Sequence, residues 1–577
     1  MDITIAHQIS TLLDQGKDQE ADLLVKEIPV DRGALPGEIL AQIGRLRLRQ
    51  FRYDDASQML LLSLKKGYFA KGIIKAAISR LIELKDANNA IAISAAALAT
   101  NPEEATTLYL YGTVMSSFHL PELAEPALRK ATLGLSDDDG VFRALGNCLL
   151  KIRKVQDARI SFDKALALAP AKATVRSFLP ENIIRNALEE QPNWSWAQYQ
   201  LGIQTFESRR FGEAEALFSD IVEREARSEL HAAACAMQAE CVRRVYDKTI
   251  AASKITAIIE RHGVEGDPWR DLYRGLLSYY AGDIHEAAVR FSHVTPIAIE
   301  QLAVSRGVTT FVAEVDSSSS TFKPANFEVY GGDVRETDEL IVFAAADGRY
   351  TELFLEPFVG SILNSNGNVP IHIHVVNPTN KSKKAIQDIC ETVPWARISH
   401  SSEEISLPAP RPYYAMARFL IAPKLMDHFK KPLLVVDIDA AMIKGVRTAI
   451  SDFADYDVAA KYNPSNKIEF PWMEIFATFI LFMPTGGAKN FLKNLSDYFF
   501  ANYDQSGKID TWWIDQNALF YANRQADTSG NCRLTKINDS ALDRCIEANL
   551  PMESKFQFAN RIKNAFPLAA IVHPEAV

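Results

Sequence analysis

A 34-residue period runs through the first half of the chain and constrains its fold more than any other feature of the sequence. Small and large apolar residues recur at this spacing: Ala56, Ala90, Ala124 and Ala158; Gly44, Gly112 and Gly146; Leu60, Leu128 and Phe162. A period of this length is typical of stacked helix pairs, each of which buries its apolar face only on its neighbours. We therefore expect an all-α solenoid over residues 1–300, with an atypical cap at 1–36.

The clearest unit, residues 140–170, reads GVFRALGNCLLKIRKVQDARISFDKALALAP and closely resembles a tetratricopeptide repeat. Gly146 and Ala158 are small where two antiparallel helices would cross, and Phe162 would fill the layer between them. Pro170 would end the second helix. The pattern returns after an interruption at about 173–194. The resemblance implies a concave groove that would recruit an acceptor protein or glycan, and such an array could also serve oligomerisation.

Net charge and cysteine usage narrow the classes of function. Lys plus Arg number 63 and Asp plus Glu number 72, a formal charge of −9, whereas a domain that neutralises many phosphates leans the other way. We therefore expect no nucleic-acid partner. The six cysteines are scattered, and no apolar run approaches the roughly 18 residues that span a bilayer. These features predict a cytoplasmic protein with no transmembrane segment and no N-terminal signal sequence.

The second half of the chain has a different pattern. Clustered serines, a proline and a glycine pair between Asp316 and Asp333 are typical of a linker, which we place at 301–336, before a domain at 337–577. Short strands then alternate with helices: strands at 339–346, 370–377 and 432–439, and helices at 351–363, 381–390 and 413–426. This alternation predicts an α/β domain with a mostly parallel sheet, covered on both faces, whose ligands bind at the carboxyl ends of the strands.

Two carboxylates stand at the end of one predicted strand. The apolar run at 432–436 leads directly into Asp437-Ile438-Asp439. Period-two geometry would point both carboxylates to one side, where they could jointly hold a hard divalent cation such as Mn²⁺ or Mg²⁺. A D-x-D sequence is short, and a plain strand-end turn is the alternative interpretation.

The same region resembles a family of enzymes. The segments LIVFAAADGRYTELFLEPFVGSIL, PIHIHVV, MARFLIAPKL, KPLLVVDIDAAMIKGV and WWIDQNAL occur in the order and approximate spacing of GT-A fold glycosyltransferases, over roughly residues 338–525. They look most like glycosyltransferase family 8, the retaining group that includes the lipopolysaccharide galactosyltransferases and glycogenin. The resemblance implies a Rossmann-like nucleotide-diphospho-sugar transferase of bacterial type. Its donor would be a nucleotide diphosphate sugar, with a UDP-sugar favoured, and its metal ion Mn²⁺ in preference to Mg²⁺.

The resemblance also implies roles for single residues. Asp347 and Tyr350 match residues that grip the nucleotide base and ribose, and Arg418 matches a donor-side arginine. Asp437 and Asp439 match the metal and diphosphate site, and the pair Asp515-Gln516 matches the acidic-amide pair beside the donor sugar. Structural alternatives remain open for three of them: Tyr350 packed on its own helix, Arg418 in a plain salt bridge, and Asp515 as the N-cap of a helix at 516–523.

The chain departs from the family pattern in two places. Where the family usually has an F-N-x-G-like turn, residues 475–479 read IFATF, so the amide that touches the donor sugar is missing and the identity of the sugar stays open. The family also tends to end with a metal-binding His and a basic segment. Here Arg561 and Lys563 could close over the diphosphate, and His573 is the candidate third metal ligand, with a surface histidine as the alternative.

These observations favour a glycosyltransferase that moves a sugar to a hydroxyl of an acceptor protein or glycan, such as a lipopolysaccharide, recruited by the repeat array. The alternative hypothesis is a repeat-array scaffold or adaptor whose transferase domain has decayed. The intact D-x-D argues against decay. A nucleotidyltransferase is a third hypothesis, but FAAADGRY lacks the glycine-rich basic loop usual for that chemistry. The sequence leaves open the donor sugar, the acceptor and the stereochemical outcome.

Overall fold

The computed structural model describes residues 2–28, 32–172, 174–177, 179–225, 227–294, 300–315, 327–463, 466–504, 506–509, 511–548 and 554–571. The chain forms two compact units, Met1–Ala234 and Cys235–Val577. The expected order is confirmed in its broad form, because a helical solenoid precedes an α/β domain with a mixed sheet.

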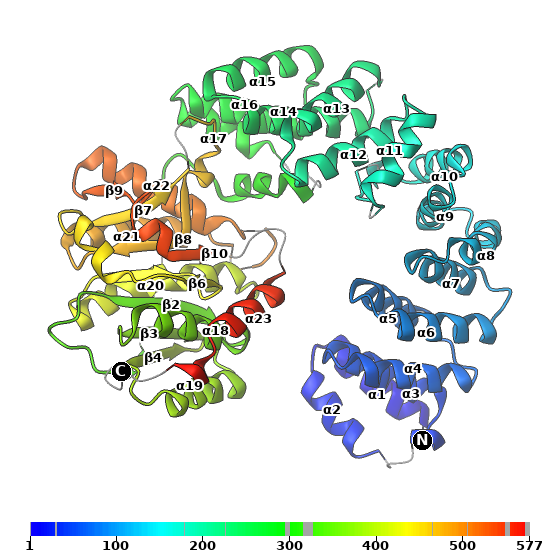
Figure 1. The fold of residues 1–577 in the computed structure, drawn as a ribbon, viewed down its shortest axis with the longest axis horizontal. Helices are drawn as coiled ribbons and strands as arrows, with labels where there is room; N and C mark the ends of the chain where they lie inside the picture. Colours follow the sequence, from blue (N-terminus) through cyan, green and yellow to red (C-terminus); the bar gives the residue numbers. More distant parts are fainter. Residues whose placement is uncertain are drawn as a thin grey trace. The chain divides into compact units, whose positions relative to one another are not determined.

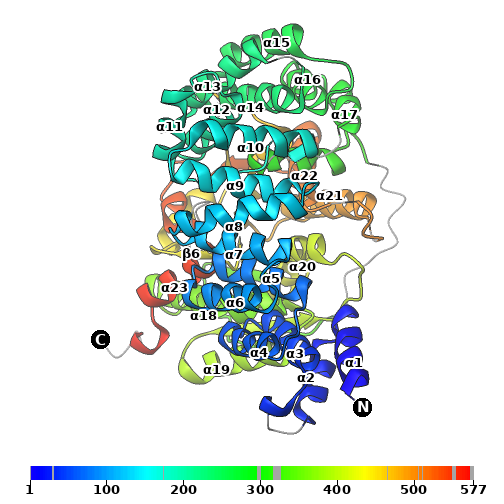
Figure 2. The same cartoon turned by 90° about the vertical axis from the view of Figure 1, so that its right-hand side faces the viewer.

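The first unit is built from helix pairs that follow one another along the chain. Figure 2 shows the pairs from α3 to α10 stacked in sequence order. The helices are α1 (Asp2–Asp14), α2 (Asp18–Lys26), α3 (Gly37–Arg49), α4 (Tyr53–Lys65), α5 (Lys71–Glu83), α6 (Ala87–Thr100), α7 (Ala105–Ser117), α8 (Pro121–Gly134), α9 (Asp139–Lys151), α10 (Val155–Leu168), α11 (Glu181–Glu190), α12 (Ser195–Glu207) and α13 (Phe211–Arg224).

The crossings within the pairs explain the sequence period. A Cβ added at Gly146 on α9 would lie 2.6 Å from Cε2 of Phe162 on α10, so only glycine lets these helices approach. The interruption expected at 173–194 holds α11, a single helix. Beside it Trp196 stacks on Phe162 with 3.7 Å between ring centroids, and Trp194 lies 5.2 Å from Trp196. These rings continue the apolar core across the break in the repeat.

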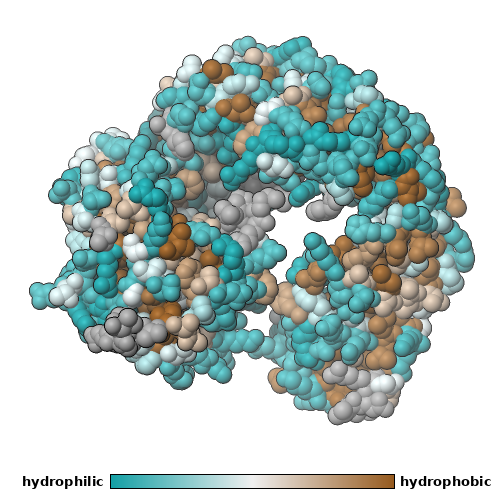
Figure 3. Space-filling model, viewed as in Figure 1, coloured by the Kyte–Doolittle hydropathy of each residue, from teal (hydrophilic) through white to brown (hydrophobic). Residues whose placement is uncertain are grey.

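The apolar side chains of the repeats mostly point between helices. Figure 3 shows hydrophilic residues over most of the visible surface, with apolar residues exposed among them and more densely over part of the helical array. Leu133 on α8 and Ile160 on α10 are among the exposed exceptions, with 83% and 59% of their surface accessible. Scattered exposed apolar residues are normal on a globular surface and identify no binding face by themselves.

The helical array continues into the second unit and packs there on the α/β domain. Its last helices are α14 (Glu229–Val245), which crosses the boundary between the units, α15 (Lys248–His262), α16 (Pro268–Tyr280) and α17 (Ile284–Ser292). A 3-10 segment, η3 (Glu300–Thr310), follows. Part of the linker expected at 301–336 is therefore regular structure, and residues 316–326 lie outside the described residues. The compact units divide at 234/235, whereas the sequence suggested a division after residue 300.

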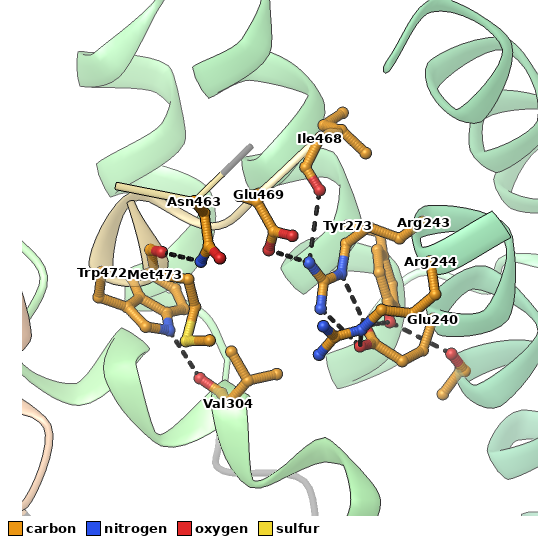
Figure 4. A network of polar contacts seen from close by, with 11 residues as sticks. Glu240, Arg243, Arg244, Tyr273, Val304, Asn463, Ile468, Glu469, Trp472 and Met473 are labelled. Carbon is orange, nitrogen blue, oxygen red and sulfur yellow. Dashed lines mark hydrogen bonds and ion pairs between the residues drawn. The ribbon is translucent and has the colours of Figure 1, made fainter. Parts of the chain in front are cut away.

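A buried polar network holds α14 and α16 against the α/β domain (Figure 4). The Arg243 side chain is fully buried and donates to both carboxylate oxygens of Glu240, at 2.6 and 2.9 Å, and to Glu469. The Tyr273 hydroxyl donates to Glu240 at 3.1 Å. Burial alone would raise the pKa of Glu240, but the Arg243 and Arg244 guanidinium groups together outweigh burial and lower it. The carboxylate thus stays ionised and paired inside the protein.

Aromatic packing on Trp472 fixes η3 to the same domain. The Trp472 indole N–H donates to the Val304 carbonyl at 2.8 Å, and the ring stacks on Phe470 with 5.1 Å between centroids. A Cβ at Gly307 would lie 2.4 Å from the indole ring, so the η3 backbone lies directly against it. Phe291 of α17 packs edge-on to the same ring at 5.0 Å. The helical segment and the sheet domain therefore share one core within the second unit.

The central sheet has eight strands in the order β1-β4-β3-β2-β5-β8-β7-β9. The strands β4, β3, β2 and β5 are parallel, as expected, but β8 is antiparallel to both β5 and β7, so the sheet is mixed. The strands are β1 (Tyr330–Gly331), β2 (Ile341–Asp347), β3 (Ile371–Val376), β4 (Ile398–Glu403), β5 (Leu433–Val436), β7 (Val458–Tyr462), β8 (Ile475–Phe482) and β9 (Leu534–Lys536). A short pair, β6 (Ala440–Met442) and β10 (Ile546–Ala548), lies apart.

Helices cover both faces of this sheet (Figure 1). Alternate residues of β2 enter two cores: Val342 packs in the core with α18 and α19, and Phe343 in the core with α20 to α22. This alternation is why the strands read as continuous apolar runs. The helices are α18 (Gly348–Asn366), α19 (Asn380–Thr392), α20 (Arg411–Phe429), α21 (Gly486–Asn502), α22 (Ile514–Ser529) and α23 (Lys555–Ala565).

We predict that Arg243→Met destabilises the second unit by about 3–5 kcal/mol, because it leaves Glu469 without its buried counter-ion and Glu240 with Arg244 alone. The loss of unfolding free energy is measured by urea denaturation of the full chain, with hydrogen exchange of the α14 and η3 amides as the local readout. The exposed Arg544 offers a matched control in Arg544→Met, which should be close to neutral. Equal losses of unfolding free energy in the two variants would show that the buried network contributes no more to stability than an exposed arginine does.

Candidate active site

A cavity of about 1420 Å³ lies at the carboxyl ends of β2 and β5. The last residues of these neighbouring parallel strands, and the turns that follow them, reach it from the middle of the sheet. Six of the residues singled out in the sequence line it: Asp347, Tyr350, Arg418, Asp437, Asp439 and Asp515. The strand-end location expected for a ligand site is thus where these side chains meet.

Arg418 of α20 joins two of the carboxylates. Its Nη1 lies 2.5 Å from Oδ1 of Asp437, and its Nη2 lies 3.7 Å from Oδ2 of Asp515. The Arg418 side chain is 7% exposed and Asp515 is 12% exposed, so the cluster is largely withdrawn from water. When both carboxyls are ionised, two carboxylates and one guanidinium leave a net negative charge at this wall of the cavity.

Burial changes the protonation of this cluster. It raises the pKa of Asp437 to about 7, against the lowering effect of Arg418, and the neighbouring Asp439 and Asp515 add to the rise. Burial likewise raises the pKa of Asp515, with Arg418 again opposing. A carboxyl that changes protonation near neutral pH, as Asp437 does, is typical of sites where charge is exchanged with a ligand.

A lysine lies between Asp439 and Tyr350, two residues that line the same cavity. Lys555, the first residue of α23, places its ammonium 2.7 Å from Oδ2 of Asp439 and 2.7 Å from the hydroxyl of Tyr350. The same ammonium lies 4.7 Å from the centre of the Tyr350 ring. Tyr350 also packs on Phe354 of its own helix, at 5.4 Å between centroids. Tyr350 therefore both lines the cavity and packs on its own helix.

Asp347 has a structural task as well. It ends β2 and caps α18, because its Oδ1 accepts hydrogen bonds from the backbone N–H groups of Arg349 (2.8 Å) and Tyr350 (3.2 Å). This cap directs the start of α18 toward the cavity. Asp515, in contrast, is not an N-cap: it lies in the first turn of α22, whose N-cap position is held by Trp513.

Three other predicted residues are not brought to the cavity. In the orientation that satisfies its amide, Gln516 donates to the carbonyls of Ile475 (2.7 Å) and Trp472 (3.2 Å), so it holds the β7–β8 connection. Arg561 pairs with Glu547 at 2.8 Å, and Lys563 with Glu356 at 2.6 Å. His573 lies outside the described residues. Residues 475–479, where the family pattern has a turn, belong to β8.

Five cations that no sequence pattern singled out also line the cavity: Arg306, Arg349, Arg411, Lys508 and Lys555. Ser554 and Gln557 form a capping box, which marks a helix start at this point of the sequence. That signal locates Lys555 at a helix end but not at the active site. Arg306 has no comparable signal, because it comes from η3, a segment expected to be a linker.

The acidic residues suit a hard divalent cation by their chemistry. Mg²⁺ and Mn²⁺ take oxygen ligands and are commonly held by one or two carboxylates together with substrate phosphates. Asp437 and Asp439 supply such oxygens on one cavity. The described residues contain no group of three or more His, Cys, Asp or Glu side chains placed to hold a metal ion. Within that part of the chain, an ion here would depend on ligand oxygens and water.

Comparison with known proteins yields fold likenesses only. No family model matches the chain, and no curated protein matches it. A solved structure of MamA from Desulfovibrio magneticus RS-1 is 16% identical over 33% of this chain and 94% of its own, with a TM-score of 0.23. A tetratricopeptide repeat protein from Parabacteroides merdae is 13% identical over 53% and 96%, with a TM-score of 0.26.

A third solved structure is the glycosyltransferase GlyE of Streptococcus pneumoniae. It is 14% identical over 35% of this chain and 46% of its own, with a TM-score of 0.25. Likenesses at these identities and scores carry no argument about activity. None of the described helices is long and apolar enough to cross a membrane.

We predict that the effect of Asp437→Asn on stability depends on pH. Because the pKa of Asp437 is raised in the folded protein, the folded state binds a proton that the unfolded chain has released, and the parent loses stability as pH rises from about 4 to 7. Asparagine does not titrate. The unfolding free energy of the variant, relative to the parent, should therefore increase over this range and level off above it.

Urea unfolding at several pH values, with chelator and without nucleotide, measures this difference. The exposed Asp452 provides the control substitution, Asp452→Asn, which removes a carboxyl outside the cavity. A constant difference between the Asp437 variant and the parent would contradict the assigned pKa.

Proposed function

We propose that the α/β domain is a glycosyltransferase of GT-A type that transfers a sugar from a nucleotide diphosphate sugar to an acceptor hydroxyl. One observation carries the proposal: strand-end residues from β2 and β5, with Arg418 and Asp515 from two helices, line a single cavity large enough for a nucleotide sugar. The motifs that resemble glycosyltransferase family 8 are the ones that supply these residues.

In this proposal the donor nucleotide lies over the start of α18. The N-terminal end of a helix favours an anion, and Asp347 and Tyr350 would contact the ribose and base. Asp437 and Asp439 would hold a divalent ion, Mn²⁺ in preference to Mg²⁺, which supplies charge neutralisation to the diphosphate when it is bound. The UDP-sugar donor, the retaining outcome and the participation of His573 remain predictions of the resemblance.

The chain's own cations have defined tasks in this mechanism. Arg418 keeps the Asp437 and Asp515 carboxylates in place from the buried side. Asp515 would face the donor sugar and stabilise positive charge that develops on it. Lys555 would exchange its contact with Asp439 for the diphosphate, a strong acceptor of charged hydrogen bonds. Gln516, Arg561 and Lys563 would make no direct contact with the donor, because their side chains are bound to other residues outside the cavity.

The helical repeats would recruit the acceptor protein or glycan, as the resemblance to tetratricopeptide repeats implies. The alternative is a scaffold with a decayed transferase domain. It is favoured by the fact that both carboxylates of the D-x-D pair already have a partner cation, Arg418 and Lys555. A decayed site would retain its fold and lose turnover.

We predict that Asp437→Asn combined with Asp439→Asn abolishes donor hydrolysis, because the variant replaces both carboxylates that would hold the metal ion with neutral amides. The measurement is nucleotide diphosphate release from a panel of UDP-sugars by the full chain, with Mn²⁺ and with chelator. Asp452→Asn, an exposed change outside the cavity, should leave the rate unchanged.

Two results would decide between the hypotheses. Full activity in excess chelator, or turnover by the folded double variant, would eliminate the metal-dependent mechanism. No hydrolysis of any nucleotide sugar by the parent protein, together with normal folding, would favour the scaffold.

We also predict that Lys555→Met weakens the binding of a nucleoside diphosphate roughly tenfold, because a charged hydrogen bond to phosphate is lost. Isothermal titration calorimetry with UDP, in chelator, measures the change without relying on turnover. Lys563→Met on the same helix is the matched control, since Lys563 pairs with Glu356 away from the cavity. Equal affinity in the two variants would exclude Lys555 from the donor site.

A further inference from the structure

The cations that line the cavity fall into two groups. Arg418 and Lys555 are paired with the carboxylates at the strand ends. Arg306, Arg349, Arg411 and Lys508 line the same cavity, and no ion pair joins any of the four to another residue in the described part of the chain. Arg349 lies at the start of α18, beside Asp347 and Tyr350. The other three come from η3, from the start of α20 and from the segment before α22, and we call the surface that these three segments form the second wall. The cavity therefore has positive charges that the chain does not neutralise both at the start of α18 and on the second wall.

Arg306 is placed on this second wall by contacts on both sides. The Asn517 amide donates to the Gly307 carbonyl at 2.7 Å and to Oγ1 of Thr310 at 2.8 Å. Trp472 donates to the Val304 carbonyl, as Figure 4 shows, and its ring packs against Gly307. The backbone on each side of Arg306 is thus fixed, while its side chain remains exposed in the cavity. Such a fixed backbone reduces the entropy lost when a guanidinium binds an anion.

The same contacts relate Arg306 to the reacting region. Asn517 lies on the first turns of α22, two residues after Asp515, which lines the cavity. Trp512, just before α22, also lines it and is 44% exposed. On the same segment, Gly507 lies close to Ala409, whose carbonyl accepts a hydrogen bond from the Tyr503 hydroxyl at 2.6 Å. An exposed indole and a guanidinium therefore line the same cavity as Asp515.

We propose that this wall is the acceptor subsite and that it selects a sugar bearing a phosphate or carboxylate. The guanidinium of Arg306 matches the two oxygens of such a group by a bidentate pair, and Lys508 and Arg411 add positive charge. The Trp512 ring offers an apolar surface to the flat face of a pyranose. A neutral sugar would leave the three cations without a partner, whereas an anionic sugar satisfies them. The role of this wall as an acceptor subsite rests on the proposed glycosyl transfer, but the binding of an anionic sugar to it can be tested without any transfer.

The experiment measures binding of three probes to the full-length protein by ligand-observed NMR: galactose, galactose 6-phosphate and galacturonate. We expect the two anionic sugars to bind and galactose to bind at least tenfold more weakly. Arg306→Gln should weaken the anionic sugars roughly tenfold. It should leave the affinity for UDP within twofold of the parent. Arg335→Gln is the matched control, because Arg335 is exposed on the same domain and does not line the cavity.

Each other outcome overturns the inference. Equal binding of galactose and galactose 6-phosphate would show that charge is not selected, and inorganic phosphate binding as tightly as galactose 6-phosphate would show that the sugar is not recognised. A matching loss of UDP affinity in Arg306→Gln would assign Arg306 to the donor. Binding of a glutamate-rich peptide in place of the anionic sugars would assign the wall to a protein partner. Failure of the proposed transfer appears separately, as absence of nucleotide release by the parent.

Discussion

The fully buried Arg243 joins the two kinds of structure in this chain. A buried guanidinium is tolerated only when its charge is matched, and here Glu240 from its own helix and Glu469 from the sheet domain match it. The pairing requires that α14 and the β7–β8 connection lie together. As a result, the last helix pairs belong to the same compact unit as the sheet, and the repeat array does not end at a free linker.

The packing of the helical segment on the sheet domain extends to the cavity through α22. Three successive residues of this helix face three different neighbours: Asp515 the cavity, Gln516 the β7–β8 connection, and Asn517 the backbone of η3. The residues that hold η3 and Trp472 are thus one helical turn from the residue proposed to face the donor sugar. A change in the helical segment has a short physical route to the candidate active site, through side chains that are buried and already hydrogen-bonded.

The sequence was sufficient wherever a periodic pattern determined the structure. The repeat period located the helix pairs, and the strand-end rule located Asp347, Asp437 and Asp439 on one cavity. The acidic-amide pair was harder, because two adjacent helix residues face about 100° apart, so Asp515 reaches the cavity and Gln516 does not. Lys555 and Arg306 follow from long-range packing of α23 and η3, and no local pattern encodes such contacts. The antiparallel direction of β8 could likewise not be predicted, because an apolar run in the sequence does not indicate the direction of its strand within the sheet.

The close helix crossings carry a further consequence for the repeats. At five crossings a glycine on the first helix faces a large side chain on the second, as in Gly146 with Phe162. One period before Gly112 and Leu128, the pair α5 and α6 has the sizes reversed: Ile78 stands at the glycine position and Ser94 at the position of the leucine, both fully buried. The combined volume across the crossing is conserved although neither residue type is. The repeats therefore preserve the combined side-chain volume of two facing positions, which lie sixteen residues apart in the sequence.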